Sequence, residues 1–288
     1  MPVAVITFDF DPLLRLGDGF VLRWQTLALA AVIVACLSVA AVMVRRAGLR
    51  AEDLLYITVG AVPGAVVAAR LGYGLAHLDA FGPDPARLLD PAVGGMDLAM
   101  GVVGGCLAAA YVASLLDTSI GRWADALALP LLVALGAGKL TMVLGGSGQG
   151  LPTDVGWATA YLGPGPWGSL AADLPSHPAQ VYEGAATLVW ALVLIVLASV
   201  ALRRRADGRL LLVAIAGWAL IRAAVSVTWR DPAVIGPLGP AGLMALAVGF
   251  GAIAAIPVIA RVRGASAPSN PSAPGEPSWP DPASRPRF

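Results

Sequence analysis

The residues of this chain that could do chemistry are few, because charged side chains are rare within its long apolar stretches. Arg70, Lys139 and Arg222 each lie inside such a stretch. A cation at the centre of a bilayer costs about 2.5–3.5 kcal/mol on insertion scales, so each marks a candidate functional site. An isolated cation near a helix end can instead extend its head group to the interface at little cost. A grouping of all three would favour a function.

A second polar group is the segment HPAQVYE at residues 177–183. Pro178 suits the first turn of a helix, and Gln180 and Glu183 are three residues apart, which places them on one helical face. The free N–H groups at such a helix start favour an anion. A carboxylate in a membrane helix needs a partner, and we expect Arg222 or Arg70 to pair with Glu183.

His177 and Tyr182 belong to the same segment, and each has a simpler interpretation. A histidine just before a helix can be a surface residue, and a tyrosine there can be an interfacial aromatic anchor. Arg70, Tyr73 and His77 are separated by three and four residues, so they are expected on one helical face.

The composition predicts the elements that must position these residues. Of 288 residues, 58% are hydrophobic and 13% charged, whereas soluble domains are about 25% charged. An apolar helix of about 20 residues crosses a bilayer. We therefore predict an all-α, polytopic membrane protein. Its predicted spans are residues 26–44, 55–77, 96–116, 125–144, 180–202, 210–228 and 242–260.

Basic residues are unevenly distributed between these spans. Arginines follow the first, third, fifth and seventh spans, whereas residues 145–178 contain no Lys or Arg. The positive-inside rule then predicts an N-terminus outside and a C-terminus in the cytoplasm. Residues 1–264 form one transmembrane domain, and residues 265–288, rich in Pro and Ser, are predicted to be a disordered cytoplasmic tail.

This topology predicts that the candidate residues meet at one membrane level. Arg70, Lys139 and Arg222 would each lie late in a helix that runs outward, and Glu183 would begin a helix on that side. A pocket of cations at the headgroup level suits the phosphate of an anionic lipid, which Arg can bind through two parallel hydrogen bonds.

Several segments resemble those of the bacterial prolipoprotein diacylglyceryl transferases, over most of residues 20–250. HPAQVYE is similar to the family's His-Pro-x-Gln-Leu-Tyr-Glu, and ARLGY at residues 69–73 to its Gly-Arg-x-Gly-Tyr. Further similar pieces are Arg23-Trp24, Gly94-Gly95-Met96, Gly150 at the end of the family signature, and Arg222 followed by Trp229, Arg230 and Asp231.

The chain also differs from the family pattern at several positions. Lys139 stands where the family signature has Arg, which keeps the charge but loses the planar fork. Ala99 stands where the family has a histidine, and Ser226 where it has an acidic residue. Other replacements are Gln25, Met142 and Ser147.

The resemblance implies transfer of a diacylglyceryl group from phosphatidylglycerol to the lipobox cysteine of a prolipoprotein. It implies a catalytic role for His177, Glu183 and Tyr182, with His77 as the alternative base. The lipid phosphate would be bound by Arg70, Lys139, Arg222, Gln180, Arg23 and Gly150.

The implied partners are phosphatidylglycerol, prolipoprotein signal peptides and membrane lipids, in the bacterial cytoplasmic (inner) membrane. We expect no cofactor, no metal and no nucleic acid. One alternative is a catalytically silent relative that binds an anionic lipid or a signal segment. A small transporter is the other alternative, and it ranks last because the sequence has neither an inverted repeat nor a broken helix near the midplane.

Overall fold

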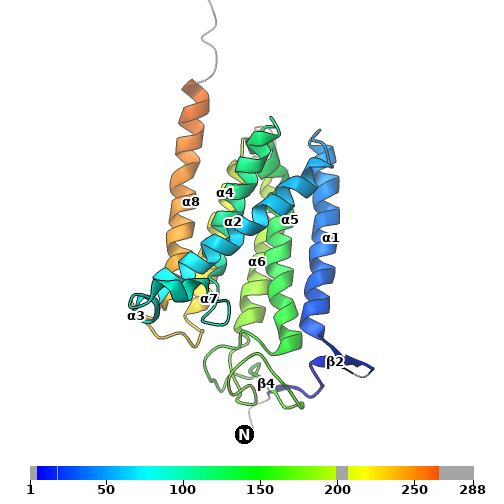
Figure 1. Ribbon diagram of the computed structural model, residues 1–288, viewed down its shortest axis with the longest axis vertical. Coiled ribbons are helices and arrows are strands. Elements are labelled where there is room, and N and C mark those ends of the chain that lie inside the picture. The colour runs from blue at the N-terminus through cyan, green and yellow to red at the C-terminus, as the bar shows by residue number, and fades with distance from the viewer. Residues whose placement is uncertain (1–4, 18, 199–206, 266–288) are drawn as a thin grey trace, which may run out of the picture.

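The computed structural model describes residues 5–17, 19–198 and 207–265, and it is mainly helical (Figure 1). Seven of the described helices are long and apolar enough to cross a membrane. This confirms the seven predicted spans and the all-α class. The seven helices are α1 (Trp24–Arg46), α2 (Asp53–Ala76), α4 (Leu98–Leu115), α5 (Ile120–Thr141), α6 (Ala179–Leu197), α7 (Arg209–Ser226) and α8 (Pro240–Ala265).

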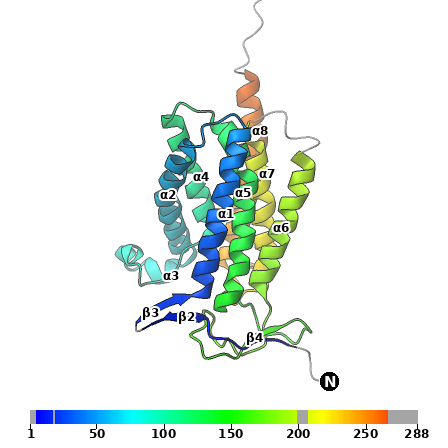
Figure 2. The same cartoon turned by 90° about the vertical axis from the view of Figure 1, so that its right-hand side faces the viewer.

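Short elements gather at one end of the helix bundle, opposite the end at which α8 finishes (Figure 2). β1 (Ile6–Phe8) pairs in parallel with β4 (Thr159–Tyr161), and β2 (Leu13–Leu16) forms an antiparallel hairpin with β3 (Phe20–Arg23). The remaining short elements are α3 (Leu78–Phe81), η1 (Pro85–Leu89) and η2 (Met142–Gly145). The strands are an addition to the prediction from the sequence, which consisted of helices alone.

Small residues allow the helices to pack closely, as is common in membrane bundles. At the contact between α2 and α4, a Cβ added to Gly104 would lie 2.3 Å from the carbonyl oxygen of Gly64. The core between α4, α5, α6, α7 and α8 is lined largely by alanines around the fully buried Trp218. These contacts fix the ends of α5, α6 and α7 next to one another.

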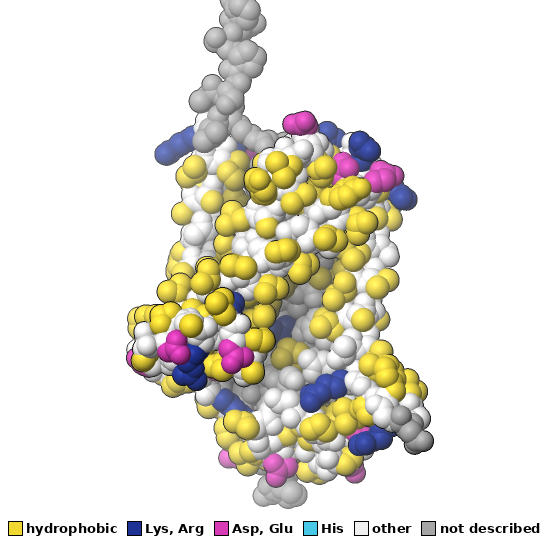
Figure 3. All heavy atoms as spheres, in the orientation of Figure 1, with side chains coloured by type: hydrophobic (Ala, Val, Ile, Leu, Met, Phe, Trp, Pro, Cys, Tyr) yellow, Lys and Arg dark blue, Asp and Glu magenta, His cyan; other side chains and the backbone are white. Residues whose placement is uncertain are grey.

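The charged residues lie mostly at the two ends of the bundle, and the middle of the face in Figure 3 is largely apolar. Arg45 and Arg46 form the last turn of α1, and the Arg122 guanidinium in α5 donates to the Ala47 carbonyl. Arg209 begins α7 at that same end. This clustering agrees with the predicted cytoplasmic side, although the orientation itself stays a prediction. Arg203, Arg204 and Arg205 lie outside the described residues. Of the predicted tail at 265–288, only Ala265 is described, as the last residue of α8.

Candidate active site

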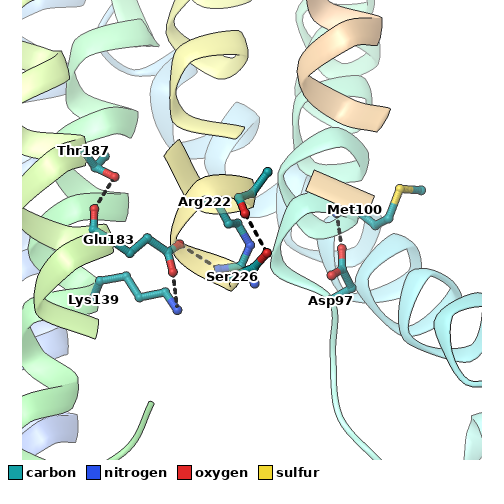
Figure 4. A network of polar contacts seen from close by, with 8 residues as sticks. Asp97, Met100, Lys139, Glu183, Thr187, Arg222 and Ser226 are labelled. Carbon is teal, nitrogen blue, oxygen red and sulfur yellow. Dashed lines mark hydrogen bonds and ion pairs between the residues drawn. The ribbon is translucent and has the colours of Figure 1, made fainter. Parts of the chain in front are cut away.

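Three charged side chains from three helices form one ion-pair group. Glu183 near the start of α6 places Oε1 2.7 Å from Nη1 of Arg222 in α7 and Oε2 2.9 Å from Nζ of Lys139 in α5 (Figure 4). Glu183 is fully buried and Arg222 is 6% exposed. This confirms the expected Glu183–Arg222 pair and adds Lys139 as a second partner. We call these three residues the ion-pair group.

The local sequence of α5 and α6 holds this group in place. A Cβ on Gly184 would lie 2.9 Å from the carbonyl oxygen of Gly136, so neither helix could approach as closely with a larger residue. Lys139 is three residues after Gly136, and Glu183 directly precedes Gly184. The Thr187 hydroxyl donates to the Glu183 carbonyl at 2.6 Å. The close helix contact therefore brings the ammonium group to the carboxylate.

Trp229 lies just after α7 and covers both cations. Its ring centroid is 4.5 Å from the Arg222 guanidinium carbon and 5.6 Å from Lys139 Nζ. A cation over an aromatic face is stabilised by the ring quadrupole. In the sequence, Trp229 is recognisable only as part of the Trp229-Arg230-Asp231 motif, and no place in the site was predicted for it. Its position two residues before Asp231 gave no signal that it would fold back onto the cations.

A cavity of about 350 Å³ opens beside the ion-pair group. Figure 3 shows a hollow on this face with Lys or Arg atoms on its floor. The polar part of the lining is Tyr73, His77, Asp97, Lys139, Gln149, Gln180, Arg222, Arg230 and Asp231. Met96 and Asp97 also line a larger, apolar cavity of about 630 Å³ between α1, α2, α4 and α5. A ligand with a polar head group and apolar chains could thus place the head group in the polar cavity and the chains in the adjoining apolar cavity.

Several polar atoms at this cavity have no hydrogen-bond partner among the described residues. They are Gln149 Oε1, Gln180 Oε1, Asp97 Oδ2 and Arg222 Nε, and each belongs to a side chain that is at least nine-tenths buried. Buried polar atoms are rarely left unpaired, since each costs about 1–3 kcal/mol. Unpaired donors and acceptors on several residues that line one cavity are typical of a binding site.

Arg70 does not join the ion-pair group. Its three nitrogens donate to backbone carbonyls of the segment after α3, at 2.5–3.2 Å. The acceptors are the carbonyl oxygens of Arg87, Leu88, Asp90, Val93 and Gly95. The expectation of a three-cation clamp is corrected by these contacts, because the guanidinium holds the 87–95 segment against α2.

The HPAQVYE segment begins α6, with Pro178 at the N-cap position. The buried Gln180 amide donates to the Tyr161 hydroxyl at 3.3 Å. Burial raises the pKa of Tyr161 to about 12, although the hydrogen bond from Gln180 lowers it. The Tyr161 phenol therefore stays protonated and neutral at physiological pH.

The two other candidates of this segment face its neighbouring loop. The Tyr182 hydroxyl accepts a hydrogen bond from Trp157 Nε1 at 2.7 Å and lies 3.3 Å from His177 Nδ1. Neither His177 nor Tyr182 is part of the cavity lining, whereas His77 is. The structure thus brings the predicted alternative base, rather than the first choice, to the cavity.

Gly150 and Arg23 have different surroundings. A Cβ on Gly150 would lie 2.2 Å from the Thr228 carbonyl oxygen, so only glycine fits where the segments around these two residues cross. The Gly150 carbonyl accepts a hydrogen bond from Arg230 Nε at 2.7 Å. Arg23 is exposed at the end of β3. Gly150 therefore allows the close crossing of these two segments, and lipid contacts for Gly150 and Arg23 stay predictions.

Comparison with known proteins adds an independent finding. The family model described as prolipoprotein diacylglyceryl transferase matches residues 12–260. A phosphatidylglycerol–prolipoprotein diacylglyceryl transferase of Geobacter sulfurreducens is 31% identical over 189 residues, which is 65% of this chain and 69% of that protein. Enzymes of the same name from Clostridioides difficile and Trichormus variabilis are 22% and 26% identical, over 82% and 85% of this chain and 90% and 88% of their own lengths.

Proposed function

The chain belongs to the prolipoprotein diacylglyceryl transferase family, and we propose that it transfers a diacylglyceryl group from phosphatidylglycerol to the lipobox cysteine of a prolipoprotein. This is a step of lipoprotein maturation. Its seven apolar helices make it a multi-pass membrane protein. The proposed location is the bacterial cytoplasmic membrane, with the ion-pair group near the outer face.

The observation that carries this proposal is the charge of the ion-pair group beside the cavity. Lys139 and Arg222 share one carboxylate, so the group has a net charge of +1. The phosphodiester of phosphatidylglycerol carries a single negative charge, which this group would balance. Fixed cations in a buried site stabilise charge far better than they do in water.

The proposed reaction replaces one bond to carbon by another. The cysteine sulfur attacks the glycerol carbon that bears the phosphate, and a C–S bond forms as the C–O bond breaks. The phosphate oxygen leaves with the electron pair of the broken bond, as glycerol phosphate. The thiol proton passes to a base. Lys139 and Arg222 would offset the second negative charge that develops on the departing phosphate.

The diacylglycerol part of the substrate needs an apolar surface next to this head. The apolar cavity meets the polar one at Met96 and Asp97. This neighbourhood supports a lipid, rather than a soluble phosphate ester, as the substrate that the site accepts.

The test is transfer by the purified full-length protein in phosphatidylglycerol liposomes. A lipobox peptide should gain the mass of a diacylglyceryl group. Arg222→Ala should slow this at least about 100-fold, since one fixed donor to a developing anion contributes that much or more. Arg15→Ala is the matched control, because Arg15 is an exposed cation paired with Asp11.

Each other outcome counts against a stated part of the proposal. Bound phosphatidylglycerol without any peptide product would identify a silent lipid-binding relative and overturn the transferase activity. An Arg222→Ala protein as fast as the parent would remove Arg222 from the phosphate site.

A further inference from the structure

Asp97 has one carboxylate oxygen that the fold does not use. Oδ1 accepts the backbone N–H of Met100 at 2.7 Å, which is the ordinary N-cap bond at the start of α4. Oδ2 is buried and has no hydrogen-bond partner among the described residues. Figure 4 draws Asp97 apart from the ion-pair group, and no ion pair between them is present in the described chain.

The unpaired oxygen belongs to a residue that lines both cavities, although the oxygen itself is covered in the absence of a ligand. Asp97 is 5% exposed and lines the polar cavity that also contains Lys139 and Arg222. It also lines the apolar cavity, so it stands at the junction of the two. A buried carboxylate oxygen without a donor is costly, and a ligand that gives it a proton or a hydrogen bond would remove that cost.

We propose that Asp97 is the proton acceptor for the attacking thiol, an inference that rests on the proposed transferase function. The S–H proton moves to Asp97 Oδ2 while sulfur forms its bond to the glycerol carbon. The C–O bond to phosphate breaks, and its electron pair leaves with the phosphate. Negative charge thus moves from Asp97 to the departing phosphate, which lies beside the cations of the ion-pair group.

The other carboxylate and histidine candidates are less suited to this step. Both oxygens of Glu183 are held by Arg222 and Lys139, so Glu183 positions the cations. His177 is not part of the cavity lining. Asp231 also lines the cavity, but it is exposed, so water solvates its carboxylate. His77 is the remaining rival, since it lines the cavity and stacks on Tyr73 with 4.1 Å between ring centroids. The other charged or titratable residues of the lining are Tyr73, Lys139, Arg222 and Arg230.

The substitution Asp97→Asn separates the proton acceptor from the helix cap. Asn caps helices about as well as Asp, so the start of α4 should be kept while the base is lost. We expect transfer at pH 7 to fall about 100-fold or more, as for a missing general base. Phosphatidylglycerol binding should change less than twofold. The variant's rate should then rise about tenfold per pH unit towards pH 8.5, because ionised free thiol replaces the missing base.

Matched variants make this result specific. Asp84→Asn changes another N-cap aspartate, whose Oδ1 accepts the Ala86 N–H at 3.2 Å outside the cavity, and should transfer at the parent rate. His77→Gln should not acquire the thiol-limited pH dependence.

The inference is overturned if Asp97→Asn keeps the parent rate and pH profile, or if His77→Gln alone acquires the new profile. It is also overturned if Asp97→Asn and Asp97→Ser both lose lipid binding, which would make Asp97 structural. A parent protein without any product would instead refute the proposed function itself.

Discussion

Glu183 determines the charge balance of the site at the scale of single residues. It is fully buried and holds two cations that belong to two other helices. Removing one partner of a buried ion pair costs about 3–5 kcal/mol, because it leaves an uncompensated charge. The stability of the bundle and the affinity for a phosphate therefore depend on the same carboxylate.

We expect Glu183→Gln to lower the free energy of unfolding by about 3–5 kcal/mol and to abolish transfer. Thermal unfolding of the purified protein in detergent would measure the first effect. Glu52→Gln is the control, because Glu52 is exposed at the start of α2. An unchanged unfolding midpoint for Glu183→Gln would mean that the two cations need no internal counter-charge.

Adding Lys139→Met to Glu183→Gln should recover part of the lost stability. The single variant leaves the partly buried Lys139 and the buried Arg222 without their shared counter-charge, whereas the double variant leaves Arg222 alone. Residues in direct contact are expected to be non-additive in this way. Transfer should stay absent in the double variant, so stability and activity would separate. An additive loss of stability would show that the two side chains are not coupled.

Trp229→Leu tests the ring that covers the cations. A cation–π contact contributes about 0.5–2 kcal/mol, so transfer should slow by about 2- to 30-fold. Trp229→Phe should retain most of the activity, because it keeps an aromatic face. Equal rates for Leu and Phe at this position would indicate that the ring acts through packing alone.

The sequence was sufficient to predict some of these contacts. Glu183 needed a cation, and Arg222 was predicted at the same level from the order of the spans. Arg70 behaved differently, because its partners are backbone carbonyls of a segment without apolar periodicity, which no residue pattern predicts. The free oxygen of Asp97 is likewise visible only once the cap bond to Met100 is known.

At the scale of elements, the contact between α5 and α6 controls the geometry of the site. We expect Gly184→Ala to destabilise the protein by about 1–3 kcal/mol, the usual cost of overpacking. The new Cβ would lie 2.8 Å from Leu140 Cδ2 and 2.9 Å from the Gly136 carbonyl oxygen. Transfer should fall with it, since the separation of the helices moves Lys139 away from Glu183.

Gly251→Ala is the matched control for that substitution. Gly251 lies in α8, and a Cβ there meets no atom within 4 Å. Replacing a helical glycine by alanine at such a position should leave stability equal or slightly higher. If Gly184→Ala and Gly251→Ala unfold at the same temperature, the close contact between α5 and α6 at Gly184 does not contribute to stability.

Helix positions followed from the apolar runs, but the start of α5 did not. The predicted span began at residue 125, whereas α5 begins at Ile120. The charged Asp125 therefore lies inside α5 and not before it. Its two carboxylate oxygens accept the backbone N–H groups of Gly208 and Leu210, at 3.0 Å each, which satisfies the charge at that position. The strands were not predicted, because each has only three or four residues and β1 pairs with the distant β4.

At the scale of the whole molecule, the testable quantity is the orientation in the membrane. We expect Leu170→Cys to react with a membrane-impermeant maleimide in intact spheroplasts, because Leu170 is 88% exposed in the cation-poor loop before α6. Glu52→Cys should react only after permeabilisation. Both changes are made in a chain with Cys36 and Cys106 replaced by Ala. The reverse labelling pattern would invert the topology.

The shared carboxylate of Glu183 also has a mechanical consequence. One side chain joins three neighbouring helices, α5, α6 and α7, so none of them can swing outward without pulling opposite charges apart inside the bundle. That separation is expensive in a medium of low dielectric constant. Three of the helices that line the apolar cavity, α1, α2 and α4, lie outside this trio, so an acyl chain that enters between them would leave these ion pairs intact.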